Sequence, residues 1–307
     1  MALTFIALLM MIAVLREVTA AQAPVNLRGT ARFAVLAASE ITSVPVAAIK
    51  GDVGLSPAAR SKIAGLTAPE VTGSILAADD GGATAVLLTQ AQNDLTTAYN
   101  DAAGRTLEAV DVANADLGGR TLAPGLYKST GTLNITGNLT LDAQGDPNAV
   151  YIFQVASVLT AAPGSQVILS GETKAANVFW QVGTSAAMGT TSDFKGSIMA
   201  DQSISFATGA KLEGRALVRI GAVTLESTTI TVPAQGAIAP EFGLIARSAP
   251  NSVSMAITNT PGLLLTIQSS SDLINWITLG TRTFTASPET FIDNTASSEQ
   301  KRFYRAY

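Results

Sequence analysis

Small, mostly hydroxyl-bearing residues alternate with apolar residues in five short blocks between residues 131 and 226. A threonine side chain combines an apolar methyl group, a hydroxyl that can join a network of water, and a branched Cβ that stiffens χ1. A surface built from such residues can order water, and it lacks the long hydrated side chains that would disturb that order. The candidate surface residues are Thr132, Asn134, Thr136, Val158, Thr160, Ser185, Ala187, Ser203, Ser205 and Thr224.

The same blocks predict the strands that must position these residues. The central apolar residues of successive blocks are separated by 26, 27, 18 and 19 residues, and the longer spacings contain polar inserts. A turn of about 18 residues suits three strands of roughly five or six residues each. A repeat of this size cannot bury its apolar face alone, so neighbouring turns must stack into a β-solenoid. The expected inward residues are Leu133, Ile135, Leu159, Ala161, Ala186, Met188, Ile204, Phe206, Val223 and Leu225.

The composition excludes several classes of function. The 307 residues are 47% hydrophobic and 14% charged, with a net charge of −4 and no basic run, which argues against binding to nucleic acid or to an anionic membrane. The chain has no histidine and no cysteine, so disulfides, thiol nucleophiles and the commonest general base and metal ligands are absent. A polysaccharide-cleaving solenoid would need clustered Asp, Lys or Arg beside aromatic subsites, and no such cluster is present. We therefore expect neither an enzyme nor a bound cofactor or metal ion.

The first residues carry a targeting signal. Residues 2–15 form an apolar run, and Ala21-Gln22-Ala23 supplies a cleavage site of the A-x-A type. We interpret residues 1–23 as a signal peptide and expect a secreted protein, extracellular or associated with the cell surface. The run has no Lys or Arg before it, which leaves an uncleaved membrane anchor as the alternative.

Two further patterns divide the rest of the chain. Residues 83–103 have apolar residues at helical spacing and end at Gly104, which predicts one long helix lying along a face of the solenoid. A shorter helix is expected at 57–64, opened by Pro57. Residues 234–240 are a Pro/Ala/Gly linker, after which short strands at near-regular spacing predict a small antiparallel β-sandwich at 241–307. The predicted solenoid domain is then 24–233.

The order of motifs in 24–233 resembles the microbial ice-binding protein family. The similarity covers about two thirds of the chain and is carried by many short blocks in one order, among them those at 49–57, 98–105, 122–127, 151–155, 177–182, 194–198 and 212–217. The resemblance implies a right-handed β-solenoid of triangular section with one long α-helix alongside. It also implies N-terminal segments that complete the stack and a flat face that binds ice. The tail is similar to small β-modules that end many secreted bacterial proteins.

The proposed surface chemistry agrees with that resemblance. Strands of a sheet repeat about every 4.8 Å and same-face residues about every 6.7 Å along a strand, which are distances close to repeats on ice planes. The other outward columns carry long charged side chains, which we reject as an ice face: Lys195, Lys211, Glu213, Arg215 and Arg219. We therefore predict a monomeric antifreeze protein whose partner is the ice crystal surface, giving thermal hysteresis, inhibition of ice recrystallisation and cold adaptation. The C-terminal module would contact the cell surface.

The sequence also allows one other function and one possible metal site. The chain could be a secreted adhesin or matrix protein that uses the solenoid as a spacer. Asp52, Asp79 and Asp80 could also ligate calcium, but no Asp/Asn repeat with the spacing of a loop site accompanies them, which favours a solvated turn.

Overall fold

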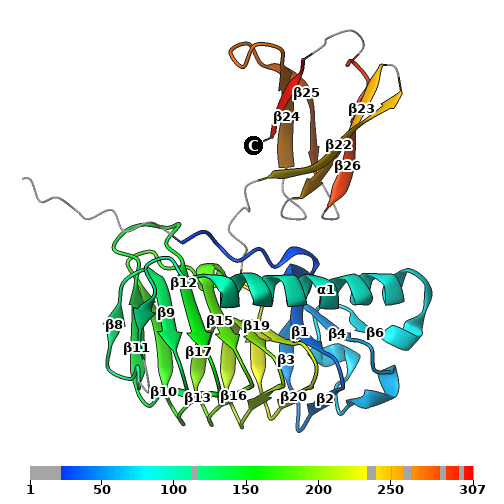
Figure 1. Cartoon of the computed structure of the whole chain (residues 1–307). Coiled ribbons are helices and arrows are strands. Elements are labelled where there is room, and N and C mark those ends of the chain that lie inside the picture. Colours follow the sequence, from blue (N-terminus) through cyan, green and yellow to red (C-terminus); the bar gives the residue numbers. More distant parts are fainter. Residues whose placement is uncertain are drawn as a thin grey trace, which may run out of the picture.

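A computed structural model describes residues 22–112, 116–233, 240–249, 251–258, 264–283, 288–296 and 301–306. Strands dominate the described part, and one α-helix, α1 (Gly82–Gly104), runs beside them (Figure 1). None of the described helices is long and apolar enough to cross a membrane. The predicted signal peptide lies outside the described residues except for its last two, and residues 234–239 of the predicted linker also lie outside them.

Two large parallel sheets form the solenoid. The first has 14 strands: β1 (Phe33–Ala37), β3 (Ala48–Lys50), β4 (Asp52–Leu55), β6 (Ile75–Ala77), β7 (Val110–Asp111), β8 (Thr121–Leu122), β9 (Gly125–Ser129), β11 (Asn138–Asp142), β12 (Tyr151–Val155), β14 (Gln166–Ser170), β15 (Val178–Val182), β17 (Asp193–Ala200), β19 (Lys211–Val218) and β21 (Thr229–Thr231). The second has seven, in the order β10 (Leu133–Ile135), β13 (Leu159–Ala161), β16 (Ser185–Met188), β18 (Ser203–Phe206), β20 (Ala222–Leu225), β2 (Glu40–Ser43) and β5 (Ile63–Ala64).

The 14-stranded sheet folds into two of the three faces of the solenoid. The first part of β19 pairs with β21 and its second part with β1, and β17 divides in the same way between β14 and β15. The change of partner falls at Gly196 in β17 and Gly214 in β19, where a side chain would not fit, because a Cβ at Gly214 would lie 1.8 Å from the carbonyl oxygen of Gly196. We call the sheet path from β6 to β7 the helix-side face. The charged face is the path through β8, β11, β14, the first parts of β17 and β19, β21 and β3. The seven-stranded sheet is the flat face.

Strands from the beginning of the chain complete the stack. Strand β1 lies between β19 and β4, β2 follows β20 in the flat face, and β3 pairs with β21. The first and last segments of the solenoid are therefore neighbours. Helix α1 then returns the chain along the helix-side face to the far end, where β7, β8 and β9 begin the remaining turns (Figure 1). This arrangement confirms the discontinuous solenoid with an accompanying helix that the resemblance implied.

The predicted inward residues form the core. All ten are at most 2% exposed, and they belong to one apolar cluster that runs the length of the stack. Aromatic rings from successive turns form an aromatic stack inside it. The ring centroids of Tyr127 and Phe153 are 5.3 Å apart and those of Phe153 and Trp180 are 3.8 Å apart, and Phe194 lies tilted against Trp180 with centroids 4.9 Å apart. The indole nitrogen of Trp180 donates a hydrogen bond of 2.9 Å to the carbonyl oxygen of Lys195, so burial leaves no polar atom of this ring unpaired.

Helix α1 packs against the outer side of the helix-side face. Its buried residues are Leu88, Ala91, Asp94, Leu95, Ala98, Tyr99 and Ala102, and the apolar ones share a second cluster with residues of β1, β9, β12, β15, β17 and β19. The alanines bring the helix axis close to the sheet, as the sequence pattern predicts. The helix extends one residue beyond the predicted 83–103 at each end.

The predicted helix at 57–64 is wrong. The structure has a 3₁₀ turn, η2 (Arg60–Lys62), preceded by a cis peptide bond at Ser56–Pro57. The backbone N–H of Ser56 donates to Ala37 and that of Ala58 to Ala38, so the segment is held by the neighbouring strand. A segment this short gains little stability from helical hydrogen bonds. Its hydrogen bonds to the neighbouring strand therefore determine its conformation. The other 3₁₀ turns are η1 (Arg28–Arg32), η3 (Ala68–Glu70), η4 (Ala78–Asp80) and η5 (Ala175–Asn177).

The described residues after 240 form two antiparallel three-stranded sheets. One contains β22 (Glu241–Ala249), β23 (Ser252–Thr258) and β26 (Glu289–Asp293), and the other contains β25 (Ile277–Thr283), β24 (Leu264–Ser270) and β27 (Phe303–Ala306). Their buried residues make a separate core: Val253, Met255, Ile257, Leu265, Ile267 and Ala296. The antiparallel sandwich predicted from the sequence is therefore present, with β22 as a strand that the sequence pattern did not reveal.

Leu95→Ala should destabilise the solenoid by about 2–5 kcal/mol, because it removes a fully buried side chain between α1 and the sheet and leaves a cavity. Chemical denaturation followed by far-UV circular dichroism measures the change. Asn93→Ala, on the exposed side of the same helix, is the matched control and should alter stability little. Equal midpoints for Leu95→Ala and the parent would show that the helix is not packed as described.

Candidate functional site

The flat face arranges small residues in columns that run across its strands. Its register pairs Leu133 with Leu159, Leu159 with Ala186, Ala186 with Ile204 and Ile204 with Val223, which confirms the alignment of blocks made from the sequence. The residues one position further along form the central outward column: Asn134, Thr160, Ala187, Ser205 and Thr224.

The remaining sequence candidates lie beside this central column. Ser185 and Ser203 are paired on one side of it, with Val158 and Thr132 at the corresponding positions of β13 and β10. Thr136 lies on the other side, directly after β10. None of the ten candidates is buried, and the hydroxyl oxygens of Ser185 and Ser203 are 2.9 Å apart. The structure thus gathers all ten at one sheet, while their role in binding stays a prediction.

Sequence reasoning missed the part of this face that the N-terminal strands supply. Thr42 of β2 pairs with Thr224 and with Ala64 of β5, so the central column is two strands longer than predicted. The hydroxyl of Thr42 donates to that of Thr224 over 3.3 Å. The alternation of Ile41 and Thr42 was a local signal for a strand. The pairing of that strand with residues about 180 positions later had no local signal.

Carboxylates lie beside and beyond the uncharged central column. Glu40 and Glu226 flank the central column, on β2 and directly after β20. Asp116 lies beyond β10, bridged to Asn134. One oxygen of Asp116 accepts the backbone N–H groups of Thr136 and Gly118, each at 2.9 Å, and the other oxygen accepts the hydroxyl of Thr136. Desolvation would raise the pKa of Asp116, but these hydrogen bonds lower it overall.

The charged face differs sharply from the flat face. The ammonium group of Lys195 lies 2.8 Å from a carboxylate oxygen of Asp193 and 3.5 Å from one of Glu213, and Lys211 is exposed nearby. These long side chains lie off the flat face, as predicted. Arg219 also lies off it, with its guanidinium 2.8 Å from a carboxylate oxygen of Asp201.

Arg215 requires a correction, because the sequence pattern placed it on an exposed column and the structure buries it to 1% exposure. The Arg215 side chain points out of the solenoid core, as predicted, but the 3₁₀ turn η1 covers it. The guanidinium Nε donates to the carbonyl oxygen of Ala31 at 2.8 Å, and Nη1 donates to the hydroxyl of Ser197 at 3.4 Å. Desolvation lowers its pKa to about 10, so the group remains charged at neutral pH.

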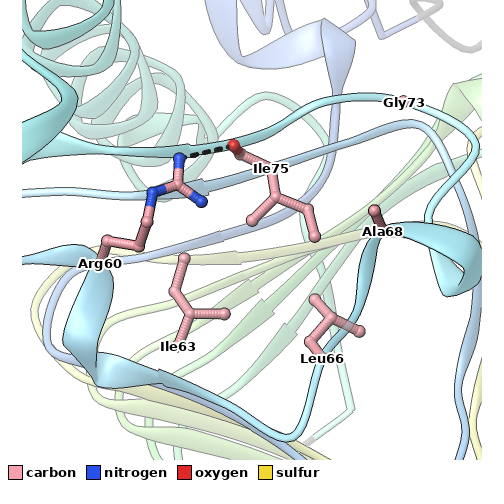
Figure 2. A pocket seen from close by; sticks show the side chains of 6 residues that line it. All are labelled: Arg60, Ile63, Leu66, Ala68, Gly73 and Ile75. Atoms are coloured by element: carbon pink, nitrogen blue, oxygen red, sulfur yellow. Dashed lines mark hydrogen bonds between the residues drawn. The ribbon is translucent and has the colours of Figure 1, made fainter.

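A hollow lies at the N-terminal end of the stack. Arg60, Ile63, Leu66, Ala68, Gly73 and Ile75 line it, and Figure 2 shows the Arg60 guanidinium turned to the carbonyl oxygen of Ile75, at 2.8 Å. Asp80, in η4, also binds this guanidinium, and Asp52, the first residue of β4, binds Arg32. Among the described residues, no three acidic side chains gather in a way that could hold a metal ion.

A model of the family described as ice-binding-like matches residues 35–231. The chain belongs to this family. An ice-binding protein of Flavobacterium frigoris (strain PS1) is 40% identical over 215 residues, which are 68% of this chain and 76% of the relative. One of Nostoc sp. (strain HG1) is 38% identical over 232 residues, which are 73% of this chain and 82% of the relative.

Solved structures of family members have the same fold. The crystal structure of an ice-binding protein from an Antarctic biological consortium is 45% identical, covers 70% of this chain and 94% of its own, and superposes with a TM-score of 0.65. The antifreeze protein LeIBP from an Arctic yeast is 35% identical, covers 69% and 97% of the two chains, and gives a TM-score of 0.63. These matched portions correspond in extent to the solenoid.

Asp116→Asn should lower thermal stability most near neutral pH, because the parent carboxylate has a depressed pKa in the folded state. Such a group stabilises the fold above its unfolded pKa, near 3.8, and this contribution is lost as the pH falls through the lower folded pKa. Melting temperatures of parent and variant across an acid titration should therefore converge at low pH. A difference that stays constant at every pH would contradict a role for the charge of Asp116.

Proposed function

We propose that this protein adsorbs to ice crystals through the flat face and thereby inhibits ice growth and recrystallisation. The observation that carries the proposal is the continuous central column of small uncharged residues on seven stacked strands, Asn134, Thr160, Ala187, Ser205, Thr224, Thr42 and Ala64. The family membership supports it, because relatives of similar sequence are named ice-binding proteins.

The physical basis is a rigid pattern of weakly polar groups. Parallel strands hold successive residues of a column about 4.8 Å apart. The buried inward residues and the aromatic stack fix the strands from behind, so the outward groups keep this spacing. Methyl groups and stiff hydroxyls can then order a layer of water that merges with the crystal, whereas a flexible ammonium or guanidinium group would disturb it. The segregation of Lys195, Lys211 and Arg219 to other faces is consistent with this use.

We further propose that the protein acts by adsorption alone, as a secreted monomer without cofactor or catalytic site. The absence of histidine and cysteine from the sequence supports this view. The apolar run at 2–15 and the cleavage motif at 21–23 support secretion. A role as a simple adhesin spacer is not favoured, because a spacer has no need for one face that is both flat and uncharged.

Ser205→Tyr should abolish most thermal hysteresis, since the aromatic ring would rise from the centre of the flat face and separate it from the crystal. Thr229→Tyr is the matched control, because Thr229 is an exposed strand residue on the charged face. Thr42→Tyr should behave like Ser205→Tyr if the N-terminal strands contribute to binding. Crystal growth velocity and freezing-point hysteresis measure activity, and circular dichroism confirms the fold. Loss of activity in Thr229→Tyr but not in Ser205→Tyr would place ice binding on the charged face and contradict the proposal.

A chain truncated after Ala234 should fold and retain ice activity. The two apolar clusters of the solenoid contain no residue beyond Val232, and the C-terminal sheets have their own core. Each part can therefore be stabilised independently. Thermal hysteresis per mole of the truncated and full chains provides the comparison. A folded but inactive truncated chain would show that the C-terminal module takes part in binding ice.

A further inference from the structure

The register of the flat face places a further column on each side of the central one. Backbone hydrogen bonds between neighbouring strands continue past the strand ends, and their N–H donors belong to Ala162, Gly189, Ala207, Glu226 and Val44. These residues follow Thr136 in the first side column. The second side column is fixed by the pairing of Ser185 with Ser203 and of Ala222 with Glu40. It contains Thr132, Val158, Ser185, Ser203, Ala222 and Glu40.

Charge is distributed unevenly over the three columns. A row consists of the outward residues of one strand together with those directly beside its ends. The rows of β10, β13, β16 and β18 contain no charged and no buried residue in any column: Thr132, Asn134, Thr136, Val158, Thr160, Ala162, Ser185, Ala187, Gly189, Ser203, Ser205 and Ala207. We call these residues the uncharged block. The next two rows, those of β20 and β2, each add one carboxylate, from Glu226 and from Glu40.

The two carboxylates flank the central threonines from opposite sides. Glu226 follows Thr224 by two residues and Glu40 precedes Thr42 by two, so each lies on the same face about 6.7 Å along the strand. Thr224 and Thr42 are themselves neighbours, with their hydroxyl oxygens 3.3 Å apart. Glu226 is exposed, and its Oε2 accepts the hydroxyl of Thr208, in the turn after β18, at 3.2 Å. Its carboxylate is therefore held at the boundary of the uncharged block.

An ionised carboxylate opposes contact with ice at these two rows. Its charge orients the surrounding water, and removing that water without supplying another partner costs much free energy. A glutamate side chain also extends further from the sheet than the threonine, serine or alanine residues beside it. A crystal seated on the uncharged block would meet these groups as soon as it spread over β20 and β2.

We propose that Glu40 and Glu226 limit the ice-contact area, so that contact is concentrated on the uncharged block and Thr42 and Thr224 are used incompletely. This inference rests on the proposed function of the flat face and identifies residues that determine its strength. Removal of the carboxylates should therefore strengthen ice binding, whereas most substitutions in a binding surface weaken it.

The test replaces each carboxylate by threonine, which already occurs in the central column. Glu40→Thr, Glu226→Thr and the double variant should each give larger freezing-point hysteresis than the parent at equal molar concentration, with the double variant highest. Glu213→Thr is the matched control, because it removes the same charge from an exposed position on the charged face and should leave hysteresis unchanged. Circular dichroism and melting temperature check the fold, and the single variants decide the question if the double variant does not fold.

A second comparison locates the gain on the flat face. Thr42→Ala should lower hysteresis more in the double variant than in the parent, because Thr42 contacts ice fully only after the carboxylates are removed. Equal losses in the two backgrounds would overturn the proposal, since Thr42 would then be fully used in the parent.

The proposal is also overturned if folded Glu40→Thr and Glu226→Thr are no more active than the parent, or if Glu213→Thr gains as much as they do, because net charge would then be the cause. Ser205→Tyr separates these outcomes from failure of the proposed function. Loss of hysteresis in Ser205→Tyr without any gain in the glutamate variants refutes only the limit on contact area. Full activity of Ser205→Tyr, or an inactive parent, refutes the proposed function itself.

Discussion

The in-register stacking of parallel strands is the constraint on which the rest of this structure depends. Leu133, Leu159, Ala186, Ile204 and Val223 occupy one buried row, and each is held in place by the next. A slip of one residue in any strand would turn its apolar side chains to solvent and its small polar ones to the core. The burial of the inward row therefore also sets the positions of the outward columns, so core packing and surface pattern are two results of one register.

Neighbouring strands of the stack are not always consecutive in the chain, so folding also requires pairing between distant segments. The flat face is complete only when β2, from the start of the chain, pairs with β20, near the end of the solenoid. Helix α1 carries the chain from one end of the stack to the other, and its packing against Phe179, Met199 and Leu217 ties the two halves together. The buried contact of Arg215 with Ala31 joins the same segments. The proposed ice-binding surface and long-range folding are consequently coupled, since the central column contains residues from both halves.

The distribution of charge separates the three sides of the solenoid by role. The helix-side face is covered by α1 and the N-terminal segment, and the charged face carries Lys195, Lys211 and Glu213. The central column of the flat face is uncharged from Asn134 to Ala64, whereas Glu40 lies in the neighbouring column, Glu226 directly follows β20, and Asp116 lies beyond β10. The flat face is therefore the side of the solenoid that a large solid partner can approach without meeting α1 or the ion pairs of the charged face.

The sequence by itself determined the local elements and the alternation that orients them. Period-two blocks predicted the strands and all ten inward residues, and the helical spacing at 83–103 predicted α1, because these patterns depend on neighbours along the chain. Only the tertiary structure decided which distant strands pair. It extended the flat face with Thr42 and Ala64, buried Arg215 beneath η1, and replaced the expected helix at 57–64 by a turn bonded to Ala37 and Ala38. Each of these outcomes depends on contacts between segments far apart in sequence, whose energies no local pattern contains.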